Sequence, residues 1–216
     1  LTKRYTQEAV KWIGSNKDKP FFVYLSHYSV HTPIQPKTQY LEHFKNKPGD
    51  RGHNNSGYAA MIQSLDESMG RIIKTLADET LSEKTIIIFV SDNGGHGGVT
   101  TNRPLRGAKG MLYEGGIRVP MIARWPGRIR PGSTSSFPSA FQDLMPTICE
   151  AVEMESGIPV GLDGISLLPV LRGEGSFEDS TRSIPLYWEY QNRRALRRGD
   201  WKIYQSGHGQ PWHLYN

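Results

Sequence analysis

The clearest periodicity in this chain lies between residues 57 and 79. Apolar side chains recur there every three or four positions, which is the spacing of one face of an α-helix. They are Tyr58, Ile62, Leu65, Met69, Ile72 and Leu76. The positions between them include Gln, Glu, Arg and Lys. We therefore predict a long amphipathic helix whose apolar face covers a sheet.

Two other segments carry helical spacing. Residues 4–14 place Val10 and Ile13 on one side, and Gly14 is expected to end that helix. Residues 141–152 gather apolar side chains on one side, namely Phe141, Leu144, Met145, Ile148, Cys149 and Val152. The chain has 1 cysteine, so it forms no internal disulfide. Its place on this apolar face predicts core packing.

Short apolar runs between the helical segments predict strands at 20–26, 85–92 and 118–126. The run at 85–92 is apolar on both faces, which favours a central position in a parallel sheet. Alternating strands and helices indicate a layered α/β core. Beyond about residue 175 the pattern changes to short strands, two of them joined at Gly199-Asp200 as a hairpin. We predict an α/β domain over 1–175 and the start of a small antiparallel subdomain over 176–216.

Composition is that of an ordinary soluble globular protein, with 37% hydrophobic and 22% charged residues among 216. No apolar run is long enough to span a membrane. The formal charge of +5 is concentrated late, at residues 193–202. We interpret this cluster as a solvated hairpin, with an anionic polymer as the alternative. Nucleic acid is not expected, because the aromatic and basic interleaving of an RNA-reading sheet is missing.

The residues Asp92 and Asn93 follow directly after the apolar run at 85–92. Ligands of open α/β sheets bind at the carboxyl ends of strands, so a site is expected here. A carboxylate beside an amide carbonyl offers hard oxygen ligands that suit Ca²⁺ or Mg²⁺. The same residues are also common turn formers, and the pair alone favours that simpler interpretation.

A lysine and a histidine lie in comparable loops. Lys109 stands between Gly107 and Gly110, which let the backbone approach a ligand closely. Its compact positive charge suits an anionic oxygen. His31 follows the apolar run at 20–26 and would reach the same sheet edge. Either residue by itself is more often a solvated loop side chain.

Taken together, several stretches resemble the arylsulfatase-type sulfatases of the alkaline phosphatase superfamily. They are "FFVYLSHYSVHTPIQP", "TIIIFVSDNGG", "PLRGAKGMLYEGGIRVPMIARWPG" and "DLMPTICEAV". The resemblance runs from about residue 20 to the end of the chain. It implies an alkaline phosphatase-like fold, in which part of a mixed, mainly parallel sheet is flanked by helices. It also implies hydrolysis of sulfate esters, as a sulfuric ester hydrolase.

The resemblance assigns roles to individual residues. Asp92 and Asn93 match a pair that supplies two ligands to an active-site Ca²⁺, with Mg²⁺ as the alternative ion. Lys109 matches a lysine that contacts the substrate sulfate and helps stabilise the leaving oxygen. His31 matches a sulfate-contacting histidine, which could also protonate the leaving alcohol.

Two further residues, His96 and Arg106, lie at more variable positions of the family. We expect at most a contact with substrate from each. Four residues late in the chain could line a sugar subsite, namely Trp188, Tyr190, Arg193 and Arg194. For the aromatic pair, Trp188 and Tyr190, we favour the alternative that they pack within the sheet.

The chain departs from the family at the nucleophile. Sulfatases use a formylglycine made from a C-x-P-S-R motif near their N-terminus, and that motif is missing here. Its Asp-Asp metal pair and Gly-Lys-Trp-His motif are missing too. The stretch at 136–140, "SFPSA", lacks the arginine and is not expected to supply a nucleophile. The chain resembles the second half of a sulfatase. We expect it to be inactive without its partner, the N-terminal half of the same protein.

Other functions stay open from sequence. A superfamily relative that hydrolyses phosphate or phosphonate esters would share the strand-end Asp-Asn pair, although such phosphatases usually hold two metals with histidine ligands. A non-catalytic module that binds anionic glycans would explain the missing nucleophile. The resemblance favours a sulfated small molecule or glycan as substrate, and a bacterial periplasmic or secreted protein.

Overall fold

The computed structural model describes residues 1–154, 156–157, 160–174 and 182–216. Contacts divide the chain into two compact units, which are treated separately below. Unit 1 comprises residues 1–86 and 95–104, and unit 2 comprises residues 87–94 and 105–216. The predicted boundary between residues 175 and 176 falls on a stretch outside the described residues and stays a prediction.

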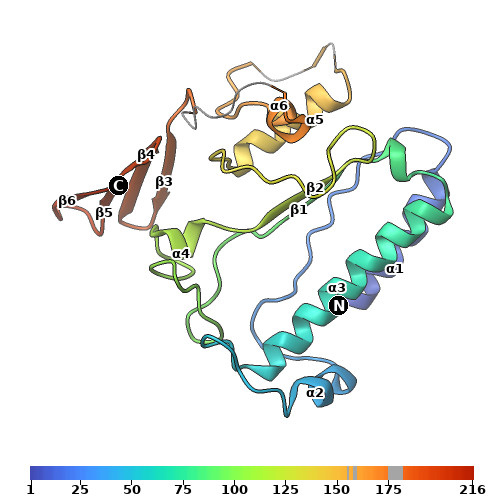
Figure 1. The fold of residues 1–216 in the computed structure, drawn as a ribbon, viewed down its shortest axis with the longest axis horizontal. Helices are drawn as coiled ribbons and strands as arrows, with labels where there is room; N and C mark the ends of the chain where they lie inside the picture. Colours follow the sequence, from blue (N-terminus) through green and yellow to red (C-terminus); the bar gives the residue numbers. More distant parts are fainter. Residues whose placement is uncertain (155, 158–159, 175–181) are drawn as a thin grey trace. The chain divides into compact units, whose positions relative to one another are not determined.

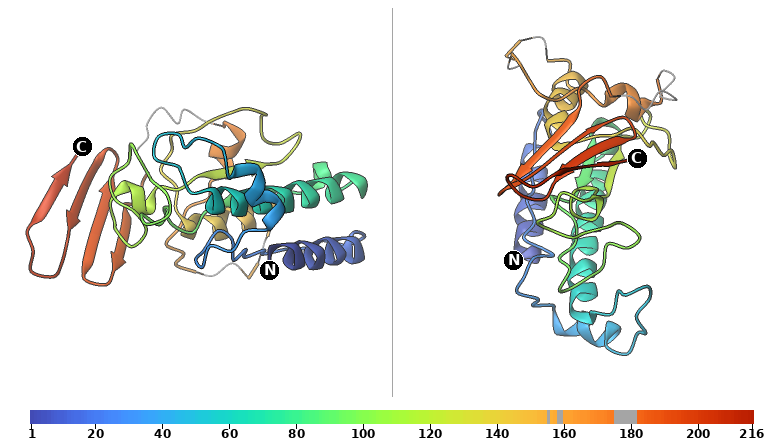
Figure 2. Two further views of the ribbon diagram at one scale, coloured as in Figure 1. Left: turned by 90° about the horizontal axis from the view of Figure 1, so that it is seen from below. Right: turned by 90° about the vertical axis from the view of Figure 1, so that its left-hand side faces the viewer.

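Unit 1 is helical. Its elements are α1 (Thr2–Asn16), α2 (Thr38–Phe44), α3 (Ser56–Asp78) and the short 3₁₀ helix η1 (Ser82–Lys84). The long helix predicted at 57–79 is confirmed as α3, and the Asn55 side chain caps it by accepting from the Tyr58 N–H at 2.9 Å. Helices α1 and α3 lie side by side in Figures 1 and 2.

The buried face of α3 differs from the predicted apolar stripe. Ile72 and Leu76 are buried as expected, but Ile62 is 47% exposed. Small residues are buried instead, among them Ser68, whose hydroxyl accepts a hydrogen bond from Thr6 of α1 at 2.7 Å. Small side chains let two helices approach closely, so α3 packs against α1 through them. Helix α1 also continues through Gly14 to Asn16.

The strand predicted at 20–26 is wrong for the described residues. This segment has no regular secondary structure, and Phe22, Val23 and Tyr24 are exposed. A strand needs a neighbour to pair its N–H and C=O groups, and no described residue pairs with this segment as a strand. Apolar composition indicated burial but could not supply that neighbour.

Unit 2 begins with a strand pair. Strand β1 (Ile87–Val90) runs antiparallel to β2 (Met121–Arg124), with Ile87 opposite Arg124 and Val90 opposite Met121. Both predicted strands exist, but the expectation of a parallel neighbour for β1 is not met among the described residues. Apolar residues on both faces report burial and say nothing about the direction of the partner.

Short helices and a second sheet complete unit 2. The helical elements are α4 (Glu114–Ile117), η2 (Phe141–Asp143), α5 (Leu144–Ala151) and α6 (Leu168–Arg172). The antiparallel sheet has the order β3 (Leu186–Tyr190), β4 (Arg193–Arg198), β5 (Trp201–Gln205) and β6 (Trp212–Tyr215). The predicted α/β class with a small antiparallel sheet is therefore confirmed. So is the β4–β5 hairpin at Gly199-Asp200, whereas β6 was not predicted.

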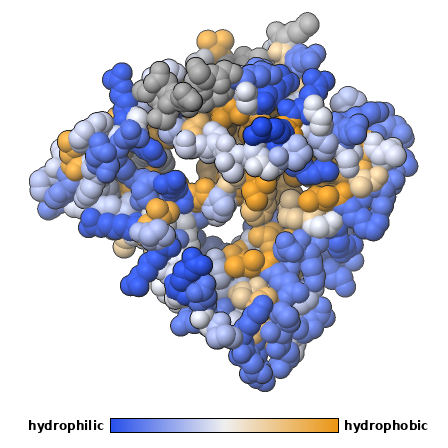
Figure 3. Space-filling model, in the orientation of Figure 1, coloured by the Kyte–Doolittle hydropathy of each residue, from blue (hydrophilic) through white to orange (hydrophobic). Residues whose placement is uncertain are grey.

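The basic cluster at 193–202 lies on this sheet. Three of its cations contact carboxylates: Arg194 with Glu189 at 3.2 Å, Lys202 with Glu114 at 2.9 Å, and Arg197 with Glu114 at 4.0 Å. The sheet shows mostly hydrophilic side chains in Figure 3, with a few apolar ones among them. Local pairing of these charges supports a structural role for the hairpin, although Lys202 is buried and not solvated as we expected.

A buried ion pair anchors the start of α5. The Arg182 guanidinium donates two hydrogen bonds, each 2.6 Å long, to the two Asp143 carboxylate oxygens, and both residues are almost fully buried. The same carboxylate accepts from the N–H groups of Ala140 and Ile165. The apolar face predicted for residues 141–152 is only partly buried. Phe141, for example, is 48% exposed.

Replacing Asp143 by alanine is predicted to lower the free energy of unfolding of unit 2 by about 3–5 kcal/mol, because Arg182 would stay buried without its counter-charge. Urea titration followed by tryptophan fluorescence measures this. Glu189→Ala, which breaks an exposed pair with Arg194, is the control and should leave the urea midpoint close to that of the unmodified protein. Equal midpoints for the two variants would contradict the account.

Candidate active site

The Asp92-Asn93 pair lies in the loop that leaves β1. The Ser91 N–H donates to the Pro120 carbonyl at 3.4 Å, and the Ser91 hydroxyl donates to the Asn93 carbonyl at 2.9 Å. Asp92 is exposed and Asn93 is half-buried. These bonds hold the loop backbone at the strand end and leave the carboxylate accessible.

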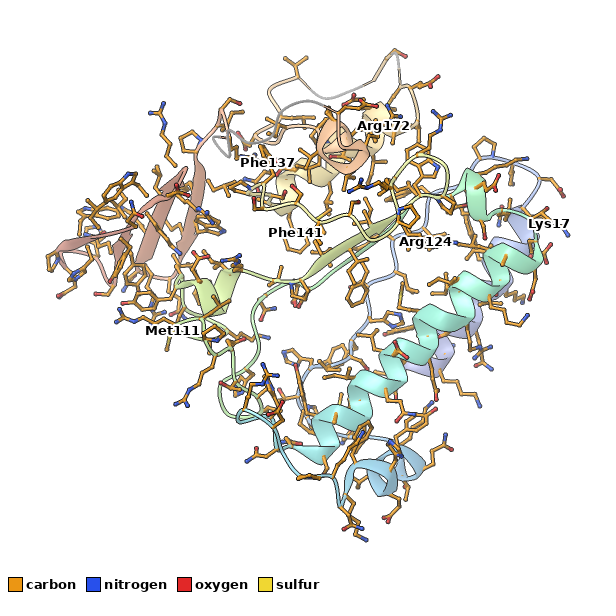
Figure 4. The ribbon with its side chains drawn as sticks, viewed as in Figure 1. Lys17, Met111, Arg124, Phe137, Phe141 and Arg172 are labelled. Atoms are coloured by element: carbon orange, nitrogen blue, oxygen red, sulfur yellow. The ribbon has the colours of Figure 1, made fainter. Side chains whose placement is uncertain are left out.

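Lys109 lies at the corner of a tight turn. The Met111 N–H donates to the Ala108 carbonyl at 3.0 Å, and Gly110 has a φ of +84°. A positive φ at the third position of such a turn favours glycine, which explains Gly110. Lys109 is exposed, and Met111 at the end of the turn, labelled in Figure 4 beside α4, is 43% exposed.

Glycines bring these two loops into backbone contact. The Gly94 N–H donates to the Gly116 carbonyl at 2.9 Å. A Cβ added at Gly94 would lie 1.9 Å from the Gly115 carbonyl oxygen, and one at Gly116 would lie 2.0 Å from the Met111 carbonyl oxygen. No real side chain tolerates such distances. The loop with Asp92 therefore rests on the start of α4, and the Lys109 turn rests on the same glycines.

The four-stranded sheet also packs against the segment that contains α4. Leu112, Ala195 and Tyr204 form a buried cluster, against which Tyr113 and Trp188 pack. Lys202, which is 7% exposed, donates to Glu114 of α4 at 2.9 Å and lies over the Trp188 ring at 5.5 Å. Trp188 is thus a packing residue, as favoured from sequence. The segment after Lys109 is fixed by both apolar and ionic contacts.

Arg106 has a defined place in unit 2. Its guanidinium lies 4.0 Å from the centre of the Tyr113 ring. Burial raises the pKa of the Tyr113 hydroxyl, with a further contribution from Tyr215, while the Arg106 charge opposes the rise. The expected substrate contact of Arg106 stays a prediction.

The two histidines proposed as site residues belong to unit 1. His31 is exposed, and its Nδ1 lies 2.7 Å from the Thr32 carbonyl oxygen. The exposed His96 accepts a hydrogen bond at Nδ1 from the Gly98 N–H at 3.1 Å. The structure defines each histidine locally, and their approach to Asp92 and Lys109 stays a prediction.

Two other residues with reactive side chains are structural. His27 bonds to the buried Ser68 hydroxyl at 3.1 Å, and burial lowers the pKa of its imidazole. Cys149 is 4% exposed, which confirms its predicted place in the core. Neither residue offers an accessible reactive group.

The Asp92-Asn93 pair is a candidate site for a cation. Asp92 and Asn93 present a carboxylate and an amide at one loop, which fits a hard ion such as Ca²⁺. No group of three or more His, Cys, Asp or Glu side chains able to hold a metal occurs in the described part of the chain. Because Ca²⁺ takes six to eight oxygens, this pair fits as part of a larger ligand set.

Comparison with known families gives the class of protein. Residues 1–154 match the Sulfatase family, and residues 108–204 match the family described as N-sulphoglucosamine sulphohydrolase, C-terminal. A sulfatase of Formosa agariphila is 34% identical over 211 residues, covering 92% of this chain and 38% of its own length. Steryl-sulfatase of Mus musculus is 33% identical over 186 residues, covering 81% and 28% respectively. The chain belongs to the sulfatase family, and it spans about a third of the length of these relatives.

Solved structures agree with this assignment. Ps i-CgsB in complex with k-i-k-neocarrahexaose superposes with a TM-score of 0.87 at 30% identity, covering 100% of this chain and 48% of that one. The PsFucS1 sulfatase from Pseudoalteromonas sp. gives 0.74 at 26% identity, covering 98% and 43%. A phosphonate monoester hydrolase of Agrobacterium radiobacter shares the fold, with a TM-score of 0.75 at 20% identity, covering 100% and 54%. Among the described residues, no helix is long and apolar enough to cross a membrane.

Sequence reasoning missed the residues that hold the site together. The contact of Gly94 with Gly115 and Gly116 could have been predicted from the sequence, because paired glycines such as Gly115-Gly116 allow two backbones to approach closely. Asn102 gave no such signal: it accepts from the Gly95 N–H at 2.8 Å and donates to the Gly95 carbonyl at 2.9 Å, closing the loop in unit 1. The Lys202–Glu114 pair was equally unpredictable, because it joins residues far apart in the sequence.

Gly94→Ala is predicted to destabilise unit 2 by about 1–3 kcal/mol or more, because the added methyl would overlap the Gly115 carbonyl. Thermal denaturation followed by tryptophan fluorescence measures the change. The control is Gly207→Ala, where the nearest atom to an added Cβ is a flexible Gln210 side chain at 3.4 Å. A Gly94→Ala protein as stable as the control would show that the two loops are not in contact.

Proposed function

We propose that this chain forms part of the catalytic domain of a sulfuric ester hydrolase. The observation that carries the proposal is the backbone contact of the Asp92 loop and the Lys109 turn with the same glycines, Gly115 and Gly116. It holds hard oxygen ligands and the exposed Lys109 amine on one small scaffold. Anionic ester hydrolysis needs both, because charge builds up on the sulfate oxygens and on the leaving oxygen.

Each residue has a distinct role in this proposal. Asp92 and Asn93 would hold Ca²⁺, with Mg²⁺ as the alternative ion; when bound, the cation would withdraw negative charge from the sulfate group. Lys109, exposed at its turn, donates to a sulfate oxygen and stabilises the leaving alkoxide. His31 contacts the sulfate and gives a proton to the leaving alcohol. Arg106 and His96 contact the rest of the substrate.

A sulfated carbohydrate is the substrate class that we propose. The structural relative Ps i-CgsB was solved with k-i-k-neocarrahexaose, a bound sugar, and its identity to this chain is 30%. The full protein would carry a formylglycine nucleophile, whose precursor this chain lacks, so the isolated chain would be inactive. We further propose a bacterial periplasmic or secreted location.

Lys109→Ala in the natural gene product that contains this chain is predicted to lower kcat for 4-nitrophenyl sulfate by about 10²–10³-fold, as loss of one donor to a developing oxyanion does elsewhere. Asp92→Ala is predicted to abolish turnover together with its dependence on added Ca²⁺. Release of 4-nitrophenol, with and without a chelator, measures both effects.

Lys74→Ala is the control, because Lys74 pairs with Asp78 on the exposed face of α3 and should leave turnover unchanged. Parallel assays use 4-nitrophenyl phosphate and a phenylphosphonate monoester. Faster turnover of either phosphorus ester than of the sulfate would make this a phosphate or phosphonate hydrolase. Tight binding of a sulfated glycan without any turnover would make it a binding module.

A further inference from the structure

The tip of the β3–β4 hairpin contacts the Lys109 turn. Tyr190 and Arg193 face each other across the hairpin, on either side of Gln191-Asn192. One guanidinium nitrogen of Arg193, Nη1, donates to the Gly110 carbonyl at 3.2 Å and to the Gln191 side-chain oxygen at 3.0 Å. Gly110 is the residue directly after Lys109, so this bond joins the sheet to the turn.

The ring of Tyr190 lies near the same glycine. A Cβ added at Gly110 would lie 3.9 Å from the ring of Tyr190, so the ring is within packing distance of the turn. Gly110 has a φ of +84°, a conformation that glycine adopts readily, and it has no side chain to restrict its backbone. The hydrogen bond from Arg193 to the Gly110 carbonyl restricts this backbone.

Arg193 itself is held by the sheet. It lies on the face of β4 that also carries Ala195, which is fully buried with Leu112 and Tyr204. The half-buried guanidinium therefore extends from a strand that is packed against the segment following Lys109. Its neighbour Arg194 lies on the opposite face and pairs with Glu189, so it has no comparable contact with the turn.

The position of Lys109 depends on the peptide groups around it. A lysine at a turn corner reaches its ligand through a flexible stem, and the direction of that stem is set by the turn backbone. Displacing a catalytic group by about 1 Å costs about 10²-fold in rate. A bond that fixes the next carbonyl therefore bears directly on the reaction.

We propose that Arg193 is a positioning residue for Lys109, acting through the Gly110 carbonyl. This inference rests on the sulfatase activity proposed above. Arg193 does not touch the sulfate; it holds the turn so that the lysine amine meets the sulfate and the leaving oxygen. The β3–β4 hairpin thereby becomes part of the active-site architecture.

The test uses 4-nitrophenyl sulfate, whose small leaving group makes few contacts beyond the sulfate, and the natural gene product that contains this chain. Arg193→Ala is expected to lower kcat about 10-fold to 100-fold with a smaller change in KM. Arg193→Lys, which keeps a donor, restores part of the loss. Arg198→Ala is the matched control: it removes the same charge from the opposite face of the same strand and leaves kcat unchanged.

A double-mutant cycle separates positioning from general destabilisation. In a Lys109→Ala background, adding Arg193→Ala should change kcat by less than about twofold, because the residue it positions is gone. Thermal denaturation confirms that each variant is folded. The inference would be overturned, with the proposed function left standing, if the two substitutions lowered kcat independently so that their effects multiplied. It would also be overturned if Arg193→Ala had the same kcat as Arg198→Ala. A wild-type protein that releases no sulfate would overturn the proposed function, and this inference with it.

Discussion

The site depends on the close approach of backbones at Gly94, Gly115 and Gly116. Any side chain at these positions would overlap a carbonyl oxygen, at distances of 1.9 to 2.3 Å. The contact lets a loop from the end of β1 and a turn before α4 share one support. Oxygen ligands and a lysine amine are thereby presented from segments that are separated in sequence.

The four-stranded sheet extends this support. Lys202 and Arg197 meet Glu114 at the start of α4, while Leu112 and Tyr204 pack beneath the same segment. An ion pair with one nearly buried partner is sensitive to geometry, so it fixes orientation more than it adds stability. The C-terminal strands thus act on the Lys109 turn, although they contribute none of the residues proposed to touch sulfate.

Local patterns predicted the elements whose partners lie nearby. The 3.6-residue period identified α3, and the Gly199-Asp200 turn identified the β4–β5 hairpin. The segment at 20–26 failed because strand formation depends on a neighbour that apolar composition does not reveal. In the proposed site, Asp92 and Lys109 were predicted from residue chemistry and resemblance, and their roles stay predictions. The roles of Asn102, Arg193 and Lys202 arise from contacts across the fold, which leave no mark in the local sequence.

The central claim is that the Asp92 loop and the Lys109 turn converge on one anionic group. A crystal structure of the natural gene product containing this chain, grown with Ca²⁺ and soaked with sulfate, tests it most directly. The account predicts Asp92 and Asn93 oxygens at about 2.3–2.6 Å from the cation. It also predicts the Lys109 amine within hydrogen-bonding distance, about 2.7–3.2 Å, of a sulfate oxygen beside that cation. A cation bound without Asp92, or a sulfate held beyond the reach of Lys109, would contradict it.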